Sequence, residues 1–226
     1  MDPIKVIEVK QDVLGQNDKR AEEVRRQLKA DGTFLLNIMS SPGSGKTTTL
    51  LGTAKRLPPD VHMAVMEADI DSTVDAAAMA EAGIDTIQVH TGGMCHLDAA
   101  MTLQGLEEVG YKDYDLVVLE NVGNLVCPAE FDTGASKNVA ILSVPEGDDK
   151  PLKYPLMFEV ANCVLINKID AASLFDFDLA VAEKNIHMRN PDAKVFPISA
   201  KTGEGMDAWV RWLTTEMKTW KEDDHE

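Results

Sequence analysis

Short apolar runs alternate along the chain with longer stretches of mixed polarity. Seven runs of four to six residues consist mainly of aliphatic or β-branched side chains, and helix-like stretches separate them. They are Phe34–Met39, Met63–Met66, Thr86–Val89, Leu116–Leu119, Val139–Val144, Cys163–Ile166 and Val195–Ile198. Strands that are apolar throughout are usually buried on both faces, so the pattern predicts an α/β fold with a mainly parallel sheet and helices on both faces.

The segment before the first run has a different pattern. Residues 11–31 carry mixed charge, with apolar residues at helical spacing, and Asp31-Gly32 interrupts the pattern. This predicts an N-terminal helix outside the sheet. We therefore divide the chain into a helical extension (1–32), a main domain (33–220) and an acidic tail (221–226).

Composition narrows the classes of partner. The formal net charge is −16 over 226 residues, which argues against nucleic acid or an anionic membrane as the main partner. No apolar run approaches the roughly 20 residues that a membrane helix needs, and the N-terminus lacks the apolar core of a signal peptide. Three cysteines are too few for a disulfide framework, so a cytoplasmic protein with reduced thiols is expected.

A phosphate-binding loop follows the first predicted strand. Residues 40–47 read Ser-Ser-Pro-Gly-Ser-Gly-Lys-Thr, close to the pattern Gly-x-x-x-x-Gly-Lys-Ser/Thr between a strand and a helix, here expected over Thr47–Leu57. The glycines let backbone amides face a phosphate, Lys46 should bridge the β- and γ-phosphates, and the Thr47 hydroxyl should ligate Mg²⁺. Ser40 replaces the first glycine, and its small side chain should still allow the turn. The residues predicted to bind the phosphates are Gly43, Ser44, Gly45, Lys46, Thr47 and Thr48.

The base specificity is indicated by Asn167-Lys168-Ile169-Asp170, which follows the sixth apolar run directly. An aspartate there can accept hydrogen bonds from guanine N1–H and the 2-amino group, which adenine does not offer. Lys168 should lie along the base while Asn167 braces the loop. Ser199-Ala200-Lys201 follows the next run and is the expected second base loop, its amides reaching guanine O6. GTP and GDP are therefore the predicted ligands, and 33–220 is predicted to be a GTPase domain.

The residues expected to sense the γ-phosphate are less regular. Glu120-Asn-Val-Gly123 follows the fourth apolar run, and Glu120 should hold Mg²⁺ through water while the Gly123 amide meets the γ-phosphate. An earlier run leads into Glu67-Ala-Asp69-Ile-Asp71, with Asp75 a turn later, and at least one of these acidic residues should serve the magnesium or the attacking water. Asn124 stands where a glutamine would orient the water, so hydrolysis should be slow.

A second constellation suits a transition metal. Cys95-His96 follows the third run, and Cys127 lies four residues beyond Gly123. Thiolate and imidazole ligands suit Zn²⁺ or Ni²⁺. Three ligands do not complete a four-coordinate site, so we expect a homodimer with the metal at its interface.

At this point the motifs match a known family. The chain resembles HypB, the GTPase that helps insert nickel into [NiFe]-hydrogenase, from about residue 10 to 218. The resemblance rests on five segments: 40–47, Gly93-Met-Cys-His-Leu-Asp-Ala99, Glu120-Asn-Val-Gly-Asn-Leu-Val-Cys-Pro128, Glu146-Gly-Asp-Asp-Lys-Pro-Leu-Lys-Tyr-Pro155 and 167–170. Ser40 is usual in this family.

The resemblance implies a P-loop G domain of the SIMIBI type and a GTP-promoted homodimer. It implies an interfacial nickel or zinc site formed by Cys95, His96 and Cys127, and a role for Asp75 beside the magnesium. It also suggests that Lys153 reaches the nucleotide of the partner protomer. The implied partners are a HypA-type nickel chaperone and the precursor of a hydrogenase large subunit. Residues 1–30 contain neither Cys nor His, so the nickel-storing N-terminal motif of some members is not expected.

Three alternatives remain at this level. The chain could be an accessory GTPase for another nickel enzyme, like the urease protein UreG, or a P-loop kinase for a small substrate. It could also be a metal-buffering protein whose GTP site only controls assembly. The long match around Cys127 favours HypB over UreG, and Asp170 argues against a kinase.

Overall fold

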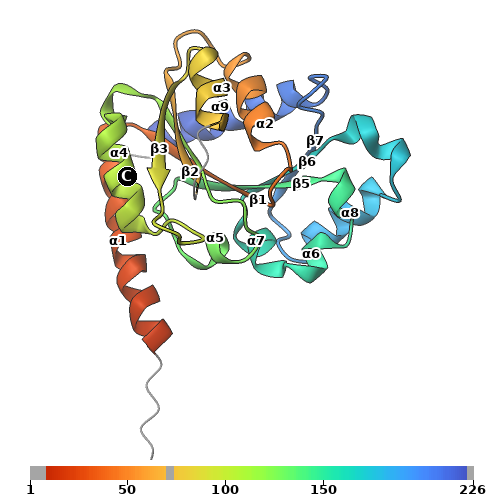
Figure 1. Cartoon of the computed structure of the whole chain (residues 1–226), viewed down its shortest axis with the longest axis horizontal. Coiled ribbons are helices and arrows are strands. Elements are labelled where there is room, and N and C mark those ends of the chain that lie inside the picture. The colour runs from red at the N-terminus through yellow and green to blue at the C-terminus, as the bar shows by residue number, and fades with distance from the viewer. Residues whose placement is uncertain (1–8, 70–73, 223–226) are drawn as a thin grey trace, which may run out of the picture.

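The computed structural model describes residues 9–69 and 74–222 of the chain. Its centre is a seven-stranded parallel sheet in the order β3-β2-β4-β1-β5-β6-β7 (Figure 1). All seven predicted strands and the α/β class are confirmed. The strands are β1 (Phe34–Ser40), β2 (Met63–Asp69), β3 (Asp85–His90), β4 (Leu116–Glu120), β5 (Lys137–Ser143), β6 (Cys163–Asn167) and β7 (Lys194–Pro197).

Helices cover both faces of this sheet, as Figure 1 shows. One face carries α2 (Lys46–Ala54), α3 (Val74–Glu81) and α9 (Met206–Glu222). The other carries α1 (Val9–Asp31) and α4 (Ala99–Val109) over β2 and β4, and α7 (Pro155–Val160) and α8 (Leu179–His187) over β5 and β6. Shorter elements lie in the loops: α5 (Cys127–Glu130), α6 (Lys150–Lys153), η1 (Tyr111–Asp113), η2 (Val144–Glu146) and η3 (Ile169–Leu174). Over the described ranges, no helix is both long and apolar enough to cross a membrane.

Several boundaries differ from the apolar pattern. Strands β2, β4 and β6 continue to Asp69, Glu120 and Asn167, because the backbone ladder does not depend on side-chain polarity. Helix α2 begins at Lys46 and ends at Ala54, short of the expected Leu57. There the Arg56 amide donates to the Thr53 carbonyl at 2.9 Å, a tighter turn that precedes Pro58.

The N-terminal helix α1 packs on the sheet through a narrow stripe. Ala21, Val24 and Leu28 are buried at spacings of three and four residues, and Val24 and Leu28 contact the core that α4 also joins. Figure 1 shows α1 and α4 side by side along the sheet. The helix is thus held by the same apolar core as the strands.

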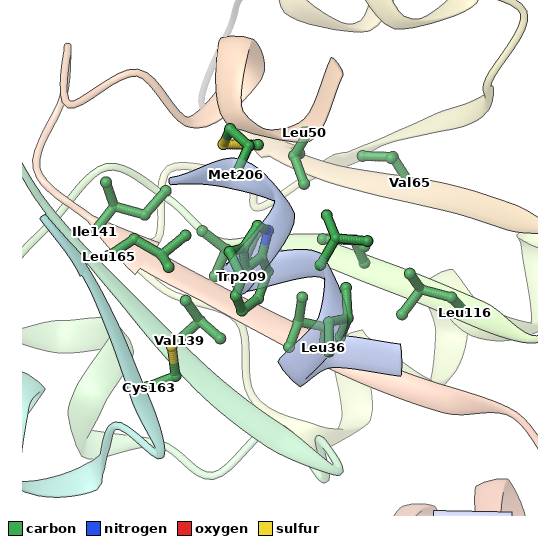
Figure 2. Packing of buried hydrophobic residues seen from close by; sticks show 14 of the residues in the cluster. Leu36, Leu50, Val65, Leu116, Val139, Ile141, Cys163, Leu165, Met206 and Trp209 are labelled. Carbon is green, nitrogen blue, oxygen red and sulfur yellow. The ribbon is translucent and has the colours of Figure 1, made fainter. Parts of the chain in front are cut away.

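The apolar core beneath α9 is centred on Trp209. Figure 2 shows its indole between Leu36, Val139 and Leu165 of the sheet and Met206 of its own helix. The Trp209 Nε1–H donates to Thr53 Oγ1 at 2.9 Å, so the buried indole has its hydrogen-bond partner. Trp212 stacks on it at 5.5 Å, which confirms that this tryptophan pair is a packing face.

Replacing Trp209 with alanine is expected to lower the free energy of unfolding by about 3–5 kcal/mol, because the change leaves a large cavity under α9. Urea denaturation measures this loss. The matched variant Trp212→Ala removes a partly exposed indole from the same helix and should cost clearly less. Equal losses in the two variants would contradict the central role of Trp209.

Candidate functional site

Functional side chains gather at the carboxyl ends of the strands, where ligands bind in sheets of this kind. The loop between β1 and α2 turns sharply through Gly43 (φ 74°) and Gly45 (φ 97°), a backbone region that favours glycine. The hydroxyl oxygens of Ser40 and Ser44 lie 2.7 Å apart, and both side chains are buried. Ser40, in the first glycine position, therefore stabilises the loop through a hydrogen bond. Lys46 and Thr47 open α2, directly after the loop.

The predicted base loop contacts the phosphate loop directly. Asn167 Nδ2 donates to the Ser44 carbonyl at 2.9 Å, and Asn167 Oδ1 accepts the amides of Lys168 (2.8 Å) and Ala200 (3.1 Å). Lys168 has a left-handed backbone, φ 66°, and its Nζ donates to the Gly43 carbonyl at 2.6 Å. Asn167 thus ties three loops together, which is the bracing geometry expected from the sequence.

The carboxylate of Asp170 is oriented by the second base loop. Ser199 is buried, and its Oγ donates to Asp170 Oδ1 at 2.7 Å. A cavity of about 370 Å³ lies between the two loops. It is lined by Gly45, Thr48, Asn167, Lys168, Asp170, Ala171, Ala200 and Lys201. The structure thus brings Asn167, Lys168, Asp170, Ala200 and Lys201 around one opening beside the start of α2, while Ser199 supports Asp170.

A larger cavity, about 640 Å³, lies elsewhere. Its lining includes Met63, Asp85 and Tyr114, which stand at or before the amino ends of β2, β3 and β4. This is the edge of the sheet opposite the phosphate loop. This cavity is larger, but it is not the candidate nucleotide site, because neither the phosphate loop nor the two predicted base loops line it.

The turn after β4 approaches the phosphate loop very closely. A Cβ atom on Gly123 would stand 3.1–3.3 Å from the ring and backbone of Pro42, so only glycine allows this contact without displacement. Glu120 ends β4 and is 3% exposed, and it pairs in register with Glu67 of β2, also 3% exposed. Two buried carboxylates paired at the carboxyl ends of β2 and β4 are donors that suit a hard divalent cation such as Mg²⁺. The side chains of Asp69 and Asp75, and all of Asp71, lie outside the described residues.

Cys95 and Cys127 come together although 32 positions separate them in the sequence. The Cys95 thiol is near enough to influence Cys127: this interaction, with partial burial and the charge of Glu130, raises the pKa of the Cys127 thiol above its usual value. Asn124 orients the second thiol: its Oδ1 accepts the Val126 and Cys127 amides at 2.8 and 3.3 Å, and its Nδ2 lies 3.6 Å from Cys127 Sγ. A pair of adjacent thiols suits a thiophilic metal ion.

His96 is held differently. Its ring stacks on Phe131 with 3.9 Å between centroids, and its Nδ1 lies 3.9 Å from Cys95 Sγ. Burial lowers the pKa of this imidazole, against the opposing charges of Asp98 and Glu130, and so favours the neutral form that binds metals. Within the described ranges, no group of three or more His, Cys, Asp or Glu side chains is arranged to hold a metal ion. The chain therefore presents two thiols and a nearby imidazole, short of a full coordination sphere.

The segment 144–155 is linked to the phosphate loop by Glu146, a residue for which the sequence predicted no individual role. One carboxylate oxygen accepts the Ser41 hydroxyl, and the other accepts the amide and hydroxyl of Ser143 at 2.8 and 2.7 Å. Lys153 is 61% exposed and pairs with Asp149 at 2.5 Å. Ser143 and Glu146 have the spacing of a capping box, which is the one sequence signal for Glu146. The capping box is present at the start of η2.

Comparison with known proteins places these features in a family. Residues 34–197 match the family model described as CobW/HypB/UreG, nucleotide-binding domain. The hydrogenase maturation factor HypB of Azotobacter chroococcum is 46% identical over 209 residues, which cover 92% of this chain and 68% of that protein. The protein of the same name from Escherichia coli K12 is 45% identical, covering 94% of this chain and 73% of its own length.

A solved structure agrees with these matches. HypB from Helicobacter pylori, crystallised in complex with nickel, superimposes with a TM-score of 0.85 at 36% identity, covering 93% of this chain and 99% of that one. The similarity therefore extends over the N-terminal helix as well as the nucleotide-binding domain.

Proposed function

Because the chain belongs to the HypB hydrogenase maturation factors of the CobW/HypB/UreG family, we propose that it is a GTP-dependent switch for nickel delivery. In this proposal the protein hydrolyses GTP slowly and assists nickel insertion into a [NiFe]-hydrogenase precursor. Family membership and the P-loop fold support nucleotide binding and hydrolysis. The choice of guanine, the slow rate and the metal site are the further parts of the proposal.

Guanine specificity is supported by the arrangement around Asp170. Ser199 occupies Oδ1 of the carboxylate, so Oδ2 stays available to guanine N1–H and the 2-amino group. Asn167 holds this loop against Ser44, which supports the proposal that base and phosphate recognition act as one connected unit. Gly43, Ser44, Gly45, Thr47 and Thr48 would hold the phosphates.

The proposed hydrolysis uses residues of three loops. Lys46 would neutralise charge on the β- and γ-phosphates, and the Gly123 amide would meet the γ-phosphate. Thr47 and Glu120, together with Asp69 or Asp75, would hold Mg²⁺, which when bound offsets the negative charge that develops on the phosphates. Asn124, in the place of a water-orienting glutamine, is already engaged with Val126 and Cys127. Its engagement supports slow hydrolysis, since even unassisted GTPases that have the glutamine turn over at roughly 10⁻⁴ s⁻¹.

The cargo is proposed to be Ni²⁺, with Zn²⁺ as a competing ion. Cys95 and Cys127 would supply thiolates and His96 an imidazole, and a second protomer would complete the coordination. GTP would promote this homodimer, with Lys153 reaching the partner's nucleotide. A HypA-type chaperone and the precursor of a hydrogenase large subunit are the proposed partners, and the cytoplasmic location expected from the sequence stays a prediction.

The observation that carries the proposal is the continuity of residues 120–127. Gly123 packs on Pro42 of the phosphate loop, and the same turn ends at Cys127, held by Asn124. Any movement of Gly123 toward a γ-phosphate must therefore be transmitted to one of the two thiols.

The test is a Ni²⁺ titration of the metal-free protein, loaded with GDP and then with a non-hydrolysable GTP analogue. We expect nickel affinity or stoichiometry to differ between the two nucleotide states, because the 120–127 turn should differ between them. Cys127→Ser should abolish the difference. Cys163→Ala is the matched control, since this third cysteine is buried in β6 and should leave both curves unchanged.

Superimposable curves for the two nucleotides would contradict coupling through the metal and would favour control of partner docking by GTP. Unchanged nickel stoichiometry in Cys95→Ala would contradict the metal site itself. The alternatives of a kinase or a UreG-like client are addressed by the same preparation, through its nucleotide preference and through the enzyme precursor that it activates.

A further inference from the structure

Helix α1 carries one polar residue on its buried stripe. Asn17, Ala21, Val24 and Leu28 are all buried and are spaced by four, three and four residues. Asn17 is 9% exposed, whereas its neighbours on either side along the helix are exposed. A buried side-chain amide in an apolar stripe needs hydrogen-bond partners. The partners of Asn17 therefore indicate its structural role.

The side-chain amide of Asn17 forms hydrogen bonds at both its oxygen and its nitrogen. Both partners are backbone groups of the segments that carry the predicted metal ligands. Its Oδ1 accepts the Ala99 amide at 2.9 Å, and its Nδ2 donates to the Asp132 carbonyl at 2.9 Å. These two partners are 33 residues apart in the sequence: Ala99 begins α4, directly after the Cys95 loop, and Asp132 follows α5. The side chain therefore fixes the distance between the two loops.

On the first side, the chain from Cys95 to Ala99 has little freedom. Leu97 is fully buried in the core under α1, and Asp98 caps α4 by accepting the Met101 amide at 2.9 Å. Asn17 holds the next residue, Ala99. The residues that directly follow Cys95-His96 are therefore fixed in position.

On the second side, Asp132 follows Phe131, the ring on which His96 stacks. Arg25, two turns further along α1, reinforces this end: its Nη2 lies 2.8 Å from both carboxylate oxygens of Asp132, and its Nε donates to the Ala135 carbonyl at 3.1 Å. The segment from Cys127 to Asp132 is thus fastened to the same helix as the Cys95 segment.

From this geometry we propose that Asn17 is a positioning residue for the Cys95/His96/Cys127 site, holding the two thiol-bearing loops at the separation that a metal ion needs. The inference rests on the proposed function, since it presumes that these side chains bind nickel. Groups that hydrogen-bond metal ligands directly typically contribute about 10–100-fold in affinity, and Asn17 acts one step further out, through the backbone, so the lower end of that range is expected. Helix α1 thereby acts as part of the metal site without contacting the metal.

The experiment measures Ni²⁺ affinity by titration of the metal-free full chain carrying Asn17→Ala. We expect affinity to fall about tenfold with unchanged stoichiometry, and the thiolate-to-metal absorption of the Co²⁺-loaded protein to shift as the thiols separate. Asn17→Asp is the second variant: it keeps an acceptor for the Ala99 amide but loses the donor to Asp132, so it should weaken binding as well. GDP affinity should stay at the wild-type value in both variants, which reports that the nucleotide site is folded.

The matched control is Asn185→Ala. Asn185 is 8% exposed and its Nδ2 donates to the Asp148 carbonyl at 3.0 Å, so the substitution removes a similar buried amide whose hydrogen bond reaches neither thiol-bearing segment. Wild-type nickel affinity in both Asn17 variants, or an equal loss in Asn185→Ala, would overturn the positioning role. If Cys95→Ser and Cys127→Ser also leave binding unchanged, the proposed metal site is wrong and the positioning role falls with it; if they abolish binding, only the role of Asn17 is wrong.

Discussion

Replacing Asp170 with asparagine should lower the affinity for GDP and GTP by about 10²–10⁴-fold. In the proposed complex the carboxylate accepts two hydrogen bonds from guanine, and hydrogen bonds to a charged group contribute about 1.5–3 kcal/mol each. Losing both therefore costs about 3–6 kcal/mol, and every 1.4 kcal/mol is roughly tenfold in affinity. The expected size makes this the most decisive test of guanine recognition.

The same substitution should redirect specificity as well as weaken binding. The Ser199 hydroxyl, 2.7 Å from Oδ1, can still donate to the oxygen of an asparagine, which turns the new amide group toward the base. That amide is a donor, and it matches the 2-oxo group of xanthine instead of the 2-amino group of guanine. XDP should therefore bind the variant better than GDP does.

Equilibrium titration with GDP, XDP and ADP measures the change. Asp176→Asn is the matched control, an exposed aspartate six positions along the chain outside the base cavity, and it should bind GDP like the wild type. Wild-type GDP affinity in Asp170→Asn would show that Asp170 does not read the base, and the assignment of GTP would then be wrong.

Gly45→Ala should reduce nucleotide affinity by roughly 100-fold. Gly45 has φ 97°, where an alanine is strained by about 1–2 kcal/mol. Its Cβ would also stand 2.6 Å from Asn167 Nδ2, and relieving such overpacking costs about 1–3 kcal/mol. The clash would displace the side chain that ties the phosphate loop to both base loops, so phosphate and base recognition should fail together.

Gly43→Ala separates these two effects. Gly43 also has a positive φ, 74°, but no atom lies within 4 Å of the added Cβ. It should therefore show only the backbone strain and a smaller loss of GDP affinity, measured in the same titration. Equal losses in the two variants would contradict the link through Asn167.

Much of the fold follows from local patterns. The apolar runs predicted all seven strands, because a strand buried on both faces needs apolar residues at nearly every position. Boundaries were less accurate: β2, β4 and β6 extend into acidic or amide residues, since backbone pairing continues past the last apolar side chain. Helix α2 is shorter than expected because its last turn tightens before Pro58.

The candidate site divides in the same way. The phosphate and base loops are readable from sequence because each is a short contiguous motif whose backbone and side chains act locally. Asn17 left a faint signal, a polar residue in an apolar stripe, but nothing local indicated which loops it binds. Glu146 left the signal of a capping box, yet its contact with Ser41 joins segments 105 residues apart.

By itself, then, the sequence determined the parallel sheet, the position of the nucleotide loops at its carboxyl edge and the chemistry of each candidate ligand. These depend on polarity, on periodicity and on motifs a few residues long. Only the tertiary structure decided that Cys95 meets Cys127, that His96 stacks on Phe131 and that one asparagine of α1 holds both loops. Such contacts depend on the order of the strands and on how far each loop extends beyond them, because distances between segments remote in the chain are set by the packing of the whole core.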